Sequence, residues 1–125
     1  MFLRRVLILD AIASAATGLF MFAGAALLEQ WLNLPATLLR YAGLSLLPFA
    51  AIVAWLGLRQ PLSRAGVWAV IALNVLWVLD SAALLVSGWV DPALLGYAFV
   101  IFQAAVVAVL AELEFIGLRR AASPA

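Results

Sequence analysis

The chain has 125 residues, of which 69% are hydrophobic and only 10% are charged, and its mean hydropathy is +1.22. This composition would expose far too much apolar surface in water, so the sequence predicts a membrane protein with lipids as its immediate partners. A formal charge of +1 gives no long-range field for nucleic acid, and no nucleic-acid partner is expected. Histidine, cysteine and lysine are absent, which excludes disulfides, zinc sites, the usual haem ligands and Schiff-base chromophores, so we expect no metal and no cofactor.

The apolar residues form four runs, each long enough to cross a bilayer at about 20 residues per span. In chain order the predicted spans are 6–28, 38–58, 65–87 and 93–118. The first run imitates a signal peptide, but its length favours a membrane anchor. Pro48 lies in the middle of the second span, where its missing N–H predicts a kink. We therefore predict an all-α, polytopic membrane protein, a four-transmembrane-helix bundle in a single domain over residues 1–125.

The arginines predict the orientation of these spans. Six of the seven lie near one set of span ends, as the pairs Arg4 and Arg5, Arg59 and Arg64, and Arg119 and Arg120. Arginine beside a membrane span is retained on the cytoplasmic side. The pattern therefore predicts that both termini are cytoplasmic, with Arg40 as the exception on the opposite side.

Polar side chains form a stripe on each of two spans. On the first span, residues spaced three or four apart give a stripe of Asp10, Ser14, Thr17, Met21 and Gly24. The third span has a similar stripe of Asn74, Trp77, Ser81 and Gly88, with Asp80 at its edge. Because polar groups in a membrane face protein or a cavity, the two stripes are expected to meet or to share a cavity.

Two of the aspartates leave alternatives open. Asp10 lies near the inner boundary, where it either joins a charge cluster with the inner arginines or contributes to a functional site. Asp80 lies deeper below the outer boundary, and Arg40 is the one cation within reach there. Asp80 is therefore either a structural partner of Arg40 or a site for a solute or a proton.

The fourth span carries polar groups on two nearly opposite faces. Gly96, Gln103 and Glu114 share one face, whereas Ala98, Ala105, Ala108 and Glu112 share the other. Lipid contact would leave an amide or a carboxylate poorly satisfied. We therefore expect a homodimer or a complex with another membrane subunit.

Three segments of the chain carry a resemblance to a known class of proteins. They are LLPFAAIVAWL at 46–56, VWAVIALNVLWVL at 67–79 and AELEFIGLRR at 111–120. In these segments the chain resembles small, uncharacterised four-span membrane proteins of proteobacteria. The resemblance implies a location in the bacterial inner membrane, and it implies no activity.

No motif for catalysis, metal binding or phosphate binding is present, so the protein is not expected to be an enzyme. The favoured function is a non-catalytic accessory, assembly or interaction subunit of the inner membrane. The alternative is a small-solute transporter or a lipid- or ligand-binding protein with an intramembrane polar pocket. The candidate residues for such a polar cluster are Asp10, Ser14, Arg40, Asn74, Trp77, Asp80, Ser81, Gln103 and Glu112.

Overall fold

A computed structural model describes residues 2–59 and 61–122, with side chains described as far as residue 120. Its elements are all helices: α1 (Phe2–Ala23), α2 (Ala25–Leu32), α3 (Ala36–Leu58), α4 (Arg64–Val86) and α5 (Leu94–Ala122). All but α2 are long and apolar enough to cross a membrane. The predicted all-α, four-span fold is therefore confirmed. Residue 60, in the predicted turn between the second and third spans, lies outside the described residues.

The first span differs most from the sequence-based limits of 6–28. The helix begins at Phe2, and α1 ends at Ala23. Backbone hydrogen bonds continue across Gly24, because its N–H donates to Phe20 and its carbonyl accepts from Leu28. The chain nevertheless bends at Gly24 and continues as α2. Glycine has a low helix propensity, which explains why the bend falls at this residue.

Helix α1 packs against α3 from Gly43 to Gly57, and small residues bring the two backbones together. A Cβ atom added to Gly43 would lie 2.6 Å from the carbonyl oxygen of Gly18, and one added to Gly18 would lie 2.8 Å from the carbonyl oxygen of Gly43. Farther along, Gly57 lies against Leu7 and Ile8 of α1. Small residues permit this close approach of membrane helices.

The loop between α4 and α5 is fixed to the end of α2. Asn33 ends α2 in the left-handed conformation, with φ of 54°, and its side-chain amide donates to the carbonyl oxygen of Asp91 at 2.6 Å. The N–H of Ala93 donates to the carbonyl oxygen of Leu32 at 2.9 Å. These bonds join the start of α5 to the first half of the chain.

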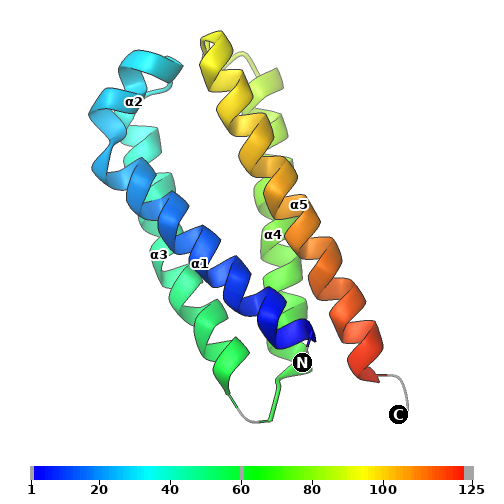
Figure 1. The fold of residues 1–125 in the computed structure, drawn as a ribbon. Coiled ribbons are helices and arrows are strands. Elements are labelled where there is room, and N and C mark those ends of the chain that lie inside the picture. Colours follow the sequence, from blue (N-terminus) through cyan, green and yellow to red (C-terminus); the bar gives the residue numbers. More distant parts are fainter. Residues whose placement is uncertain (1, 60, 123–125) are drawn as a thin grey trace.

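At the opposite end, arginine side chains bind helix C-termini. Arg4 donates to the carbonyl oxygens of Gly57 and Arg59, at 3.0 and 2.7 Å, and Arg64 donates to that of Leu118 at 3.2 Å. Cations at helix C-termini satisfy free carbonyl groups and oppose the helix dipole. Both ends of the described chain lie at this end of the bundle (Figure 1).

The buried apolar residues form two clusters with polar residues between them. The cluster near the chain ends contains Leu3, Leu7, Val53, Val67 and Leu118 among others. The cluster at the other end contains Met21, Leu28, Leu39, Leu46 and Val100 among others. The side chains of Asp10, Asn74 and Glu114 are buried in the bundle beside the first cluster. The fold therefore places its polar side chains within the membrane-spanning region.

Candidate polar site

Two buried carboxyl groups meet at a single amide. Asn74 of α4 donates from Nδ2 to Oδ2 of Asp10 on α1, at 2.8 Å, and to Oε1 of Glu114 on α5, at 2.9 Å. Ser14 donates to the other oxygen of Asp10 at 3.2 Å. We call Asp10, Asn74 and Glu114 the acid–amide cluster. The prediction that the stripes of the first and third spans meet is confirmed at Asp10 and Asn74.

The acid–amide cluster is removed from solvent. Asp10, Asn74 and Glu114 are exposed by 1%, 3% and 0% of their surfaces. Glu114 Oε2 is buried and has no hydrogen-bond partner among the described residues. A buried polar oxygen without a donor is costly, so this atom marks the place where the described interactions are incomplete.

The site contains a different glutamate from the one that the sequence predicts. Glu112, the candidate, is exposed on α5, whereas Glu114 is buried and joins the cluster. The signal was present in the helical period, because Glu114 follows Gln103 by about three turns and shares its face. Gln103 faces the other helices, as its bonds below show.

The predicted inner charge cluster around Asp10 is absent from the described part of the chain. There Asp10 accepts hydrogen bonds from Ser14 and Asn74 and forms no ion pair with an arginine. Arg4 and Arg64 instead donate to backbone carbonyl groups at the helix C-termini. The Asp10 carboxyl group is therefore held by neutral donors.

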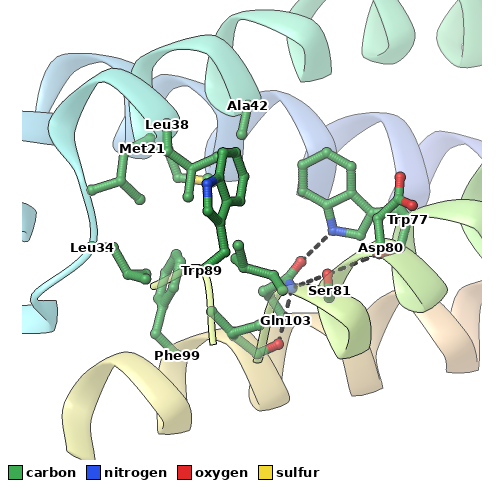
Figure 2. Close-up of a pocket in the computed structure, with 13 residues that line it drawn as sticks. Met21, Leu34, Leu38, Ala42, Trp77, Asp80, Ser81, Trp89, Phe99 and Gln103 are labelled. Carbon is green, nitrogen blue, oxygen red and sulfur yellow. Dashed lines mark hydrogen bonds between the residues drawn. The ribbon is translucent and has the colours of Figure 1, made fainter. Parts of the chain in front are cut away.

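A second polar network lies farther along α4, at the side of a cavity (Figure 2). Trp77 Nε1 donates to Oε1 of Gln103 at 2.5 Å, and Nε2 of Gln103 donates to Oγ of Ser81 at 3.1 Å. Gln103 Nε2 also donates to the carbonyl oxygen of Val100, and Ser81 to that of Trp77. This Trp77–Gln103–Ser81 network joins α4 to α5 and satisfies both ends of the glutamine amide.

Two cavities extend along the side of the bundle where α3 faces α4. The first has a volume of about 290 Å³, and the second has about 260 Å³. Trp77 and Asp80 line both, so we call them together the lateral groove. Its other walls are mostly apolar, and they include Leu38 and Ala42 of α3 and Phe99 of α5 (Figure 2).

A smaller cavity lies among the helices beside the acid–amide cluster. Its volume is about 100 Å³, and we call it the inner cavity. Asp10, Ser14 and Thr17 of α1 line it, together with Trp77 and Gln103. Trp77 therefore borders both the lateral groove and the inner cavity.

Asp80 and Arg40 do not pair. Each is exposed, and neither forms an ion pair or a hydrogen bond with another described residue. The hypothesis that Arg40 compensates Asp80 is therefore wrong for this structure. Asp80 instead lines both cavities of the lateral groove, next to Trp77 (Figure 2).

The structure thus divides the candidate residues into three sets. Asp10, Ser14 and Asn74 belong to the acid–amide cluster or contact it, and Trp77, Asp80, Ser81 and Gln103 lie at the lateral groove. Arg40 and Glu112 belong to neither. No three histidine, cysteine, aspartate or glutamate side chains in the described ranges are grouped so that they could hold a metal ion. The buried carboxyl groups of the acid–amide cluster can accept hydrogen bonds, and the Asp80 carboxylate can bind a positively charged group.

Comparison of the chain with protein-family models, with curated proteins and with solved structures gave no match.

Proposed function

We propose that the protein is a non-catalytic membrane protein that binds a small amphipathic molecule with a cationic group. The lateral groove is the binding site. The observation that carries the proposal is the Asp80 carboxyl group, which borders the groove and has no partner among the described residues.

The chemistry of the groove defines the ligand class. A carboxylate within a membrane-spanning helix is costly, by roughly 2.5 kcal/mol on the insertion scale at the helix centre and by less toward its ends, and this cost favours a partner of opposite charge. Asp80 stands about 9 Å from the end of α4 at Val86, at 1.5 Å per residue. A ligand cation would compensate Asp80, while the apolar walls accept its hydrocarbon part.

The aromatic residues of the groove favour an organic cation. Trp77, Trp89 and Phe99 all line the first cavity of the groove. A cation over the face of an aromatic ring is attracted by about 0.5–1 kcal/mol at exposed sites and by about 2 kcal/mol when desolvated. A quaternary or protonated amine with apolar substituents satisfies both Asp80 and these rings.

The groove suggests a lateral route of entry. Asp80 is exposed although it lies within a membrane-spanning helix, so a lipophilic ligand reaches it from the bilayer. The arginines at the end of the bundle that carries both chain ends support a cytoplasmic position for that end, in a bacterial inner membrane.

The test measures the binding of a lipophilic cation and a lipophilic anion of matched shape. Tetraphenylphosphonium and tetraphenylborate are titrated into the detergent-solubilised protein by equilibrium dialysis. We expect the cation to bind more tightly, and Asp80→Asn to weaken its binding about tenfold, which is about 1.4 kcal/mol. Asp91→Asn, in the loop before α5, is the matched control and leaves the affinity unchanged. Equal binding of the two ions, or no effect of Asp80→Asn, contradicts the proposal.

The outer face of α5 favours a second function, that of an interaction subunit. Glu112 is exposed there within a membrane-spanning helix, and Ala98 and Ala105 on the same face are exposed and small. We propose that this face contacts a second copy of the chain or another membrane subunit.

The absence of cysteine from the sequence permits a direct test of this contact. Ala105→Cys is oxidised in native membranes, and a disulfide-linked product is expected on gels. Ile52→Cys, on the exposed side of α3, is the control for random collision. Equal cross-linking of the two variants contradicts the contact.

A further inference from the structure

The acid–amide cluster lacks one hydrogen-bond donor. Asn74 Nδ2 has two hydrogen atoms, and the two carboxyl groups together accept both of its bonds. An ionised carboxylate accepts hydrogen bonds and cannot donate one. If both groups are ionised, Glu114 Oε2 therefore stays buried without a partner.

One added proton completes the cluster. Because Asp10 Oδ2 and Glu114 Oε1 bind the same nitrogen atom, the two carboxyl groups are neighbours, and their side chains are within hydrogen-bonding reach of each other. A proton on either carboxyl group gives a donor to the other and removes the repulsion of two buried like charges. We propose that Asp10 and Glu114 together bind a single proton, held between the two side chains.

Among the described residues, the side-chain donors to the two carboxyl groups are the neutral Ser14 and Asn74. The other charged groups on or next to the surrounding helices are Arg4 and Arg5 on α1, Arg40 and Arg59 on and just after α3, Arg64 and Asp80 on α4, and Glu112, Arg119 and Arg120 on α5. Arg4 and Arg64 donate to backbone carbonyl groups, and the guanidinium groups of Arg59, Arg119 and Arg120 lie over aromatic rings. The remaining charged side chains are exposed, namely those of Arg5, Arg40, Asp80 and Glu112. Compensation of the acid pair therefore comes from a proton.

The number of oxygen ligands at the site favours a proton over a metal cation. A hard metal cation such as Mg²⁺ or Ca²⁺ takes about six or more oxygen ligands, whereas a proton needs two. Asp10 and Glu114 provide two facing carboxyl groups in a fully buried position.

The inner cavity gives the proton a route of exchange. At about 100 Å³ it exceeds the roughly 10–15 Å³ that one water molecule needs. Asp10, Ser14 and Thr17 give it polar walls, and Ser14 also borders the lateral groove. Water in this cavity would contact Asp10, and Ser14 lies between Asp10 and the groove. The proton site stands on the acid–amide cluster alone and does not require the ligand proposed above.

Infrared spectroscopy of the full chain in lipid bilayers tests the proposal. A protonated carboxyl group has a C=O stretching band that is separate from the carboxylate bands and shifts in D₂O. We expect such a band at pH 7 in the unmodified chain. It should be lost in Glu114→Gln and in Asp10→Asn, and retained in the control variants Glu112→Gln and Asp80→Asn.

Isotope labelling keeps the test independent of whether the variants fold. ¹³C-labelled glutamate or aspartate, incorporated into the unmodified chain, should shift the band and identify the type of residue that holds the proton. Absence of the band at pH 7 overturns the proposal. Its loss in Asp80→Asn with retention in Glu114→Gln also overturns it, and so does its disappearance when sodium is added at constant pH, which would indicate a metal-cation site.

Discussion

Replacement of Asn74 by leucine tests how much the acid–amide cluster contributes to stability. The side chain is 3% exposed and makes two hydrogen bonds to different helices, so Asn74→Leu removes both α4–α1 and α4–α5 polar contacts. Hydrogen bonds between membrane helices contribute about 0.6 kcal/mol on average and about 1.7 kcal/mol at most. Two such bonds give an expected loss of about 1–3.5 kcal/mol in the free energy of unfolding.

The assay is reversible unfolding in mixed micelles of a mild detergent and sodium dodecyl sulfate, followed by circular dichroism. Ser45→Ala is the control, because Ser45 is exposed and donates only to the carbonyl oxygen of Ala42 on its own helix. Its effect is expected within about 0.5 kcal/mol, as for other surface substitutions. If Asn74→Leu destabilises the protein no more than Ser45→Ala does, the two bonds do not hold the helices together, and the reasoning from the cluster is refuted.

The same assay tests two further contacts. Gly43→Ala places a Cβ 2.6 Å from the backbone carbonyl oxygen of Gly18, so we expect a loss of about 1–3 kcal/mol from overpacking. Gly66→Ala meets the end of a flexible leucine side chain and is expected to change stability by less than about 0.5 kcal/mol; equal effects of the two variants would contradict backbone contact of α1 and α3. Trp77→Phe keeps an aromatic ring but removes the donor to Gln103, and a loss of about 0.6–1.7 kcal/mol is expected. An unchanged free energy of unfolding would show that the hydrogen bond from Trp77 to Gln103 makes no net contribution to stability.

The fold was predictable because span length and apolar composition are sequence properties. Each apolar run had to be helical, since a membrane span must satisfy its own backbone hydrogen bonds. The close contact of α1 and α3 was also partly predictable, because Gly43, Ala50, Ala54 and Gly57 share a narrow arc of the second span. Of these, Gly43, Ala50 and Gly57 are buried. The partner helix of that arc was not predictable, because small residues occur on more than one span.

The acid–amide cluster was half predictable. Asp10 and Asn74 each belong to a polar stripe, and a polar stripe in a membrane helix has to face protein or a cavity. Glu112 and Glu114 lie two positions apart on nearly opposite faces of α5, and both lie at a similar depth. Their depth in the membrane therefore does not show which glutamate joins the acid–amide cluster. Only the helix face that Glu114 shares with Gln103 indicates Glu114.

The absence of an ion pair between Asp80 and Arg40 could not be derived from their depth in the membrane and their charge. Arg40 lies at the start of α3 and Asp80 near the end of α4, so both fall in the same half of the bundle. A pairing needs the two helices to be adjacent there, and the first cavity of the lateral groove lies between α3 and α4 at this level. Helix separation is a property of the packed bundle, and one sequence does not contain it.

Trp77 determines whether the two polar regions act together. Its ring borders the lateral groove and the inner cavity, and its N–H is bound to Gln103. A ligand bound at Asp80 lies beside this ring, because Trp77 lines both cavities in which Asp80 takes part. Displacement of the ring would break the bond to Gln103 and widen the connection between the lateral groove and the inner cavity, which Asp10 lines. Under the two proposals above, ligand binding and proton exchange are then coupled through one side chain, and by linkage each changes the affinity of the protein for the other.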